Sequence, residues 1–154
     1  VGAAMVPIVE FDPDLVLETI EKEKCTGLHG VPTMFIAELN SPNFKKYDLT
    51  TLRTGIMAGS TCPIEVMKKV INEMGMSEVT IAYGQTESSP VITQTTVTDS
   101  IERKVETVGK AHPHVQVKII DPLTGKEAAP GVQGELCTRG YLVMKGYYKM
   151  PEAT

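Results

Sequence analysis

Short apolar runs alternate with one-sided amphipathic segments over the first half of the chain. Residues 3–9 form the first apolar run, which predicts a strand. Asp12 followed by Pro13 is typical of a helix start, because Asp caps free backbone N–H groups and Pro fits the first turn. The next apolar positions recur at helical spacing among charged neighbours, so we expect a helix that ends near Lys24.

The same alternation continues as far as residue 84. Further strands are predicted at residues 25–29, 54–58 and 79–83. Two helices are predicted between them. One is mostly buried and covers residues 34–39, and the other is amphipathic, with Pro63 in its first turn and Gly75 as its stop. Strands that alternate with helices are typical of β-α-β units, which build a largely parallel sheet.

The pattern changes in the second half of the chain. Residues 96–112 are polar and indicate a connector, whereas residues 115–120 and 135–139 have the pattern of antiparallel strands joined through a turn. We therefore expect an α/β fold with a partial parallel or mixed sheet and flanking helices over residues 1–95. A connector and part of a small antiparallel, barrel-like β subdomain should follow over residues 96–154.

Composition mainly excludes classes of protein. The 154 residues are 42% hydrophobic and 22% charged with a net charge of −4, which is typical of a globular domain and offers no basic surface for nucleic acid. The longest apolar stretch is too short to cross a membrane, so we expect a cytoplasmic protein, or one of the mitochondrial matrix in a eukaryote. Three cysteines without a C-x-x-C pair favour buried thiols over disulfides or zinc.

Both ends of the chain are unusual. The first residue is Val1 and not Met, and it adjoins the first predicted strand. The last residues, up to Thr154, contain no terminating element. We expect an internal piece of a longer protein.

Three turns rich in small residues follow predicted strands. They are Gly30-Val31-Pro32-Thr33, Gly59-Ser60-Thr61 and Gly84-Gln85-Thr86. Ligands of open α/β sheets bind outside the carboxyl ends of the strands, so these turns predict a pocket at one edge of the sheet. Every strand-to-helix connection needs turn residues, however, so topology alone leaves an ordinary set of turns as an equal alternative.

The third turn carries the richest chemistry. Tyr83 offers an aromatic face to a flat base, Gly84 lets a ligand approach the backbone, and Thr86 offers a hydroxyl to a phosphate. Glu87 offers a carboxylate that can hold Mg²⁺. The alternative is an ordinary strand end in which Thr86 caps a short helix and Glu87 faces solvent.

The run Tyr83-Gly84-Gln85-Thr86-Glu87 resembles the Y-G-x-T-E signature of the adenylate-forming, or AMP-binding, superfamily. Other segments resemble the same family in the same order, so the resemblance covers essentially the whole chain. They are Phe11-Asp12-Pro13, Gly30-Val31-Pro32-Thr33-Met34, Asp48-Leu49-Thr50-Thr51-Leu52-Arg53, Val108-Gly109-Lys110, Gly134-Glu135-Leu136-Cys137-Thr138-Arg139-Gly140 and Met144-Lys145-Gly146-Tyr147-Tyr148. Within the superfamily the chain is most similar to medium- and long-chain fatty acyl-CoA synthetases.

The resemblance implies a role for each motif residue. Tyr83 would stack on adenine beside Gly84 and Gln85, Thr86 would contact the α-phosphate, and Glu87 would ligate Mg²⁺; Thr86 and Glu87 would be the catalytic residues. The backbone of Gly59-Ser60-Thr61 would line the adenine. Gly30-Val31-Pro32-Thr33 and Gly84 would lie near the carboxylate substrate. Many relatives have Gly-Gly-Ala-Pro where this chain has Ala58-Gly59-Ser60-Thr61-Cys62-Pro63, which leaves the pocket shape at Ser60 and Thr61 open.

The implied reaction is ATP-dependent ligation of a fatty acid to coenzyme A through an acyl-adenylate, with Mg²⁺. The family's phosphate loop, ribose-binding Asp and C-terminal catalytic Lys have no counterpart in residues 1–154, so the piece alone should be inactive. Two alternatives stay open. One is an adenylating enzyme that passes its acyl group to a carrier protein, and the other is a non-catalytic nucleotide-binding module.

Three other kinds of site are disfavoured by spacing. Residues 55–61 superficially resemble a phosphate loop but lack its Lys. His29, His112 and His114 share no helical metal spacing, so a polar surface role is favoured over a metal site. No G-x-S-x-G motif supports a hydrolase, and no G-x-G-x-x-G motif supports a dinucleotide site.

Overall fold

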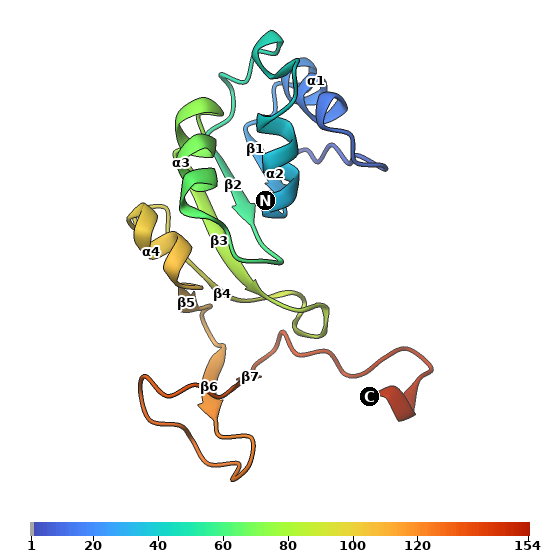
Figure 1. The fold of residues 1–154 in the computed structure, drawn as a ribbon. Coiled ribbons are helices and arrows are strands. Elements are labelled where there is room, and N and C mark those ends of the chain that lie inside the picture. Colours follow the sequence, from blue (N-terminus) through green and yellow to red (C-terminus); the bar gives the residue numbers. More distant parts are fainter. Residues whose placement is uncertain (1) are drawn as a thin grey trace.

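The computed structural model describes residues 2–154, which form two sheets and four α-helices (Figure 1). The helices are α1 (Pro13–Glu23), α2 (Pro32–Leu39), α3 (Ile64–Glu73) and α4 (Ile101–Glu106). The strands are β1 (Gly27–Gly30), β2 (Thr54–Met57), β3 (Glu78–Gly84), β4 (Val91–Gln94), β5 (Lys110–Ala111), β6 (Gln116–Ile120) and β7 (Glu135–Arg139). Short 3-10 helices cover Phe44–Lys46, Thr86–Ser88 and Pro151–Ala153.

The larger sheet has the strand order β1-β2-β3-β4-β5. The first three strands are parallel, and β4 and β5 are antiparallel to their neighbours. Helices α2 and α3 are the crossovers between the parallel strands, and each helix contacts the next from α1 to α4. Right-handed crossovers that step in one direction place their helices on one face of the sheet. The mixed sheet with flanking helices confirms the predicted α/β fold.

Local sequence explains where the first helix begins and ends. The Asp12 side chain accepts a hydrogen bond of 2.8 Å from the backbone N–H of Leu15, and Lys24 closes the helix in the left-handed conformation. Between these residues Val16, Leu17 and Ile20 are buried. The predicted helix, with its start at Pro13 and its end near Lys24, is confirmed.

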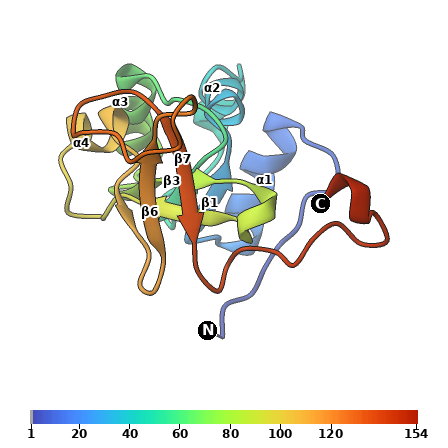
Figure 2. The ribbon, with the colours of Figure 1, turned by 90° about the horizontal axis from the view of Figure 1, so that it is seen from below.

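One hydrophobic core fills the space between the helices and the parallel strands. Its largest fully buried members come from every layer: Leu17, Phe35, Met57, Met67, Val70, Met74, Met76 and Val79. A second, smaller cluster contains Ile92, Val115 and Leu142. It packs the end of the larger sheet against the ribbon of β6 and β7, which lie side by side in Figure 2. The predicted antiparallel ribbon is thereby confirmed.

The strand predicted at residues 3–9 is wrong. These residues lie outside every strand, and Met5 and Val9 are almost fully exposed. An apolar run forms a strand only where a neighbouring strand satisfies its backbone N–H and C=O groups, and within residues 2–154 β1 is paired with β2 alone. The expectation of three buried thiols holds for Cys62 only, because Cys25 and Cys137 are partly exposed.

The polar connector predicted at residues 96–112 contains regular structure. Ser100 caps α4 through a hydrogen bond from the backbone N–H of Arg103, and Ile101 and Val105 pack against the larger core. Strand β5 then pairs with β4. A six-residue helix has too few apolar positions to show a period, which is why the pattern missed it. The division of the chain at residue 95 stays a prediction.

No helix among residues 2–154 is both long enough and apolar enough to cross a membrane.

Gly84 is a position where this fold requires glycine. A Cβ at Gly84 would lie 1.7 Å from the carbonyl oxygen of Pro90, because the chain returns there into β4. Gly84→Ala should therefore destabilise the chain by about 1–3 kcal/mol. Gly27→Ala is the matched control, since its Cβ would make an ordinary contact of 3.4 Å with Thr54. Urea denaturation measures both variants, and equal free energies of unfolding would contradict the prediction.

Candidate functional site

The two turns that follow β1 and β2 lie side by side at one edge of the sheet. The parallel register pairs Gly30 with Met57, so both strands end at the same level. The backbone N–H of Ala58 donates to the carbonyl oxygen of Gly30 at 3.2 Å. A Cβ on Gly59 would lie 3.1 Å from a methyl carbon of Val31, and Gly59 has a φ of +89°. Glycine therefore lets the second turn approach the first.

The third turn lies further along the strand direction than the ends of β1 and β2. Met57 pairs with Ile81, and β3 continues to Gly84 before the 3-10 helix Thr86–Ser88 turns the chain into β4. The Ser88 hydroxyl lies 2.8 Å from the carbonyl oxygen of Gln85 and 2.9 Å from that of Pro90, so it can bridge both sides of the turn. This buried serine gives the turn a fixed shape.

A cavity of about 420 Å³ lies between the third turn and strand β7 with the residues that follow it. Tyr83, Gln85 and Glu87 form its wall on the turn side. The opposite wall comes from residues that are distant in sequence: Leu136, Cys137, Thr138, Val143, Met144, Gly146 and Thr154. The structure thus brings three predicted site residues together in one cavity.

The other predicted site residues lie outside the lining of this cavity. Thr86 and the second turn, Gly59 to Thr61, are exposed. In the first turn Val31 and Thr33 are exposed, whereas Pro32 is buried as the first residue of α2. The second turn is therefore open surface at the sheet edge, and the first turn is exposed only at Val31 and Thr33.

Glu87 is held in the cavity by hydrogen bonds to both its side chain and its main chain. The Tyr147 hydroxyl donates a hydrogen bond to Oε1 of Glu87, and the backbone N–H of Met144 donates to the Glu87 carbonyl oxygen at 2.8 Å. The Tyr147 hydrogen bond lowers the pKa of Glu87, and the nearby carboxylate raises the pKa of Tyr147. Glu87 is therefore an anion and Tyr147 a neutral donor at neutral pH.

The residues present fit Mg²⁺ only in combination with a phosphate ligand. Residues 2–154 contain no group of three or more His, Cys, Asp or Glu side chains that could hold a metal ion. Mg²⁺ commonly binds through one or two carboxylates, substrate phosphates and water. A carboxylate that accepts one hydrogen bond keeps further lone pairs. Glu87 alone therefore suits a metal that arrives with a nucleotide.

Sequence reasoning missed the far wall of the cavity. One run that supported only the family resemblance contains Gly146, which lines that wall, and Tyr147, which follows Gly146 and contacts Glu87. Nothing in the local pattern assigned either residue to a site. Tyr147 is 60 residues from Glu87, so only the folded chain reveals their contact.

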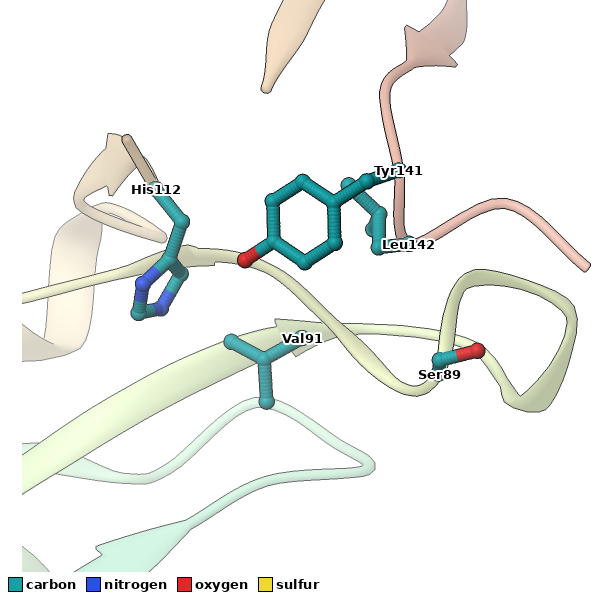
Figure 3. A pocket seen from close by; sticks show the side chains of 5 residues that line it. All are labelled: Ser89, Val91, His112, Tyr141 and Leu142. Atoms are coloured by element: carbon teal, nitrogen blue, oxygen red, sulfur yellow. The ribbon is translucent and has the colours of Figure 1, made fainter. Parts of the chain in front are cut away.

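A second, shallower cavity of about 260 Å³ lies between β4 and the residues that follow β7. Ser89, Val91, His112, Tyr141 and Leu142 line it, and Figure 3 shows the Tyr141 hydroxyl directed toward the His112 ring. Nε2 of His112 lies 3.2 Å from the side-chain oxygen of Gln94. A side-chain amide thus orients this histidine.

Comparison with protein families gives one match that spans most of the chain. The family described as AMP-binding enzyme matches residues 1–148. Over 154 residues the chain is 70% identical to YngI of Bacillus subtilis (strain 168), which is named for acyl-CoA synthetase activity; the match covers all of this chain and 28% of YngI. It is 49% identical over 148 residues to the mitochondrial medium-chain acyl-CoA ligase ACSF2 of Danio rerio, covering 96% of this chain and 24% of the ligase. The chain spans about a quarter of the length of these relatives.

Solved structures of enzymes also match most of this chain, at lower sequence identity. A luciferase-like enzyme from the mealworm Zophobas morio superposes with a TM-score of 0.79 at 28% identity, covering 92% of this chain and 34% of the enzyme. ATP-bound MatB from Rhodopseudomonas palustris superposes with a TM-score of 0.73 at 30% identity, covering 93% of this chain and 27% of MatB.

Proposed function

The chain belongs to the AMP-binding enzyme family, and from this premise we propose that it forms the adenine and metal side of the active site in an ATP-dependent fatty acid–CoA ligase. The observation that carries the proposal is the cavity that joins Tyr83, Gln85 and Glu87. The aromatic ring can stack on a nucleotide base, and the carboxylate can hold Mg²⁺ that is bound to the phosphates.

Each residue of the third turn has a proposed task. Tyr83 is 40% exposed, so its ring is free to stack on adenine. The exposed backbone of Gly59-Ser60-Thr61 would line the base together with Gly84, and Gln85 would border it. The exposed Thr86 hydroxyl would donate to an α-phosphate oxygen, and Glu87 would ligate Mg²⁺. When bound, Mg²⁺ would neutralise negative charge on the phosphates.

The proposed reaction has two steps that share the site. A carboxylate oxygen attacks the α-phosphorus of ATP, the bond to the β-phosphate breaks, and pyrophosphate leaves. The thiol of coenzyme A then attacks the acyl carbon, loses its proton, and releases AMP with the oxygen that came from the fatty acid. The first turn, Gly30 to Thr33, would lie near the carboxylate, because it adjoins the turn proposed for adenine.

The proposed substrate class comes from the relatives' names, and the proposed location comes from the organism of one relative. YngI is named for acyl-CoA synthetase activity, and the ACSF2 ligase is named for medium-chain substrates. We extend these names to a fatty acid as the carboxylate substrate. Since the 70% identical relative is bacterial, the proposed location is the cytoplasm.

Isotope transfer tests the proposed reaction directly. The full-length protein is incubated with a fatty acid carrying oxygen-18 in its carboxylate, together with ATP, Mg²⁺ and coenzyme A. One labelled oxygen should appear in AMP for each acyl-CoA formed, because the phosphorus keeps the oxygen that attacked it. Unlabelled AMP would contradict the acyl-adenylate, and labelled AMP that forms with an acyl carrier protein but never with coenzyme A would favour the carrier alternative.

A further inference from the structure

The third turn and the C-terminal segment, which we define as residues 144–154, are linked at Glu87. The backbone N–H of Met144 donates to the Glu87 carbonyl oxygen at 2.8 Å. The Tyr147 hydroxyl donates to Oε1 of the Glu87 side chain. One segment therefore holds both the main chain and the side chain of the proposed metal ligand.

The C-terminal segment holds Tyr147 in place through contacts of its own. The backbone N–H of Tyr147 donates to the Thr154 hydroxyl oxygen at 3.0 Å, and that hydroxyl donates to the Met150 carbonyl oxygen at 3.0 Å. Gly146 has a φ of +148°, and a Cβ there would lie 2.7 Å from the methyl carbon of Thr154. The absence of a side chain at Gly146 allows the segment to close on itself next to Tyr147.

From these contacts we infer that Tyr147 is a positioning residue that orients the Glu87 carboxylate toward Mg²⁺. The inference rests on the proposed function, which makes Glu87 the metal ligand. Groups that hydrogen-bond a metal ligand fix its orientation, and their loss typically weakens metal binding about 10–100-fold. The hydrogen bond at Oε1 leaves other lone pairs of the carboxylate available to the metal.

Neighbouring residues provide a matched pair of variants. Tyr147→Phe removes only the hydroxyl that reaches Glu87. Tyr148→Phe removes a hydroxyl from the next residue, whose side chain is 85% exposed and faces Lys149. Both variants lose the same atom, so a difference between them reports the contact with Glu87.

The test measures Mg²⁺ affinity and not turnover. Mg²⁺ is titrated by calorimetry into the full-length protein saturated with an ATP analogue that carries a methylene group between the α- and β-phosphorus. We expect Tyr147→Phe to weaken Mg²⁺ binding about tenfold and Tyr148→Phe to leave it unchanged. Adding Tyr147→Phe to a Glu87→Gln variant should cause no further loss, because the residue acts through Glu87.

Three results would overturn the inference. Unchanged Mg²⁺ affinity in Tyr147→Phe, while Glu87→Gln weakens it, would refute the role of Tyr147 and leave the proposed function intact. Equal losses from Tyr147→Phe and Tyr148→Phe would show a general structural effect. Unchanged affinity in Glu87→Gln would refute the metal role of Glu87, and the inference would fail with it.

Discussion

Replacing Glu87 with alanine should lower the rate of acyl-adenylate formation in the full-length protein by about a hundredfold or more. The carboxylate lies in the cavity beside Tyr83, and its pKa is held low by the hydrogen bond from Tyr147. It is therefore an anion at the pH of the reaction and suits Mg²⁺ that is bound to phosphate. Without it, the charge that develops on the leaving pyrophosphate would be poorly neutralised.

Fatty acid-dependent exchange of labelled pyrophosphate into ATP measures this first step without coenzyme A. Glu65→Ala is a suitable control, because Glu65 is an exposed carboxylate on α3 that forms a salt bridge with Lys68, away from the third turn. The control should keep the wild-type exchange rate. A wild-type rate in Glu87→Ala would remove the catalytic role proposed for Glu87.

Replacing Glu38 with glutamine should change how the stability of the chain depends on pH. Glu38 lies on α2 with 2% of its surface exposed, and its Oε2 atom has no hydrogen-bond partner within residues 2–154. Burial raises the pKa of its carboxyl from 4.5 to about 8. The folded state therefore keeps the proton that the unfolded state releases, so stability is full below pH 4.5 and falls as the pH rises toward 8.

The loss of stability can be given a rough size. The difference between the two pKa values corresponds to roughly 3–5 kcal/mol between pH 4.5 and 8.5. Glutamine cannot ionise, so Glu38→Gln should remove this loss and be the more stable protein at pH 8.5. Urea denaturation at several pH values measures the effect, with Glu23→Gln on the exposed side of α1 as control. Parallel stability curves for wild type and Glu38→Gln would contradict a buried, protonated Glu38.

The predictions that succeeded depend on local chemistry. Asp12, Pro13 and Lys24 set the ends of α1 through contacts within a few residues, so their pattern could be read directly. Glycines at the ends of β1 and β3 marked the turns, because glycine is common where a strand ends in a turn.

The failures concern contacts between distant segments. Residues 3–9 have the apolar pattern of a strand but lack a partner among the described residues. Helix α4 is stabilised by the packing of Ile101 and Val105 on a core built from earlier residues. No local pattern reveals such packing.

Part of the candidate site could be predicted from the sequence, and part of it could not. The motif from Tyr83 to Glu87 could be found because its five residues are consecutive. The opposite wall, which contains Gly146, and the Tyr147 hydroxyl that contacts Glu87 could not, because only the fold brings them to the motif. The turn from Gly30 to Thr33 carries no feature in the structure that identifies a ligand, so its role continues to depend on the family.

The most direct test of the central claim is a crystal structure of the full-length protein with ATP and Mg²⁺ bound. The proposed function predicts the adenine ring in stacking contact with Tyr83, about 3.5–4 Å away, and the metal coordinated by Glu87. A nucleotide bound elsewhere, with Tyr83 and Glu87 untouched, would contradict it.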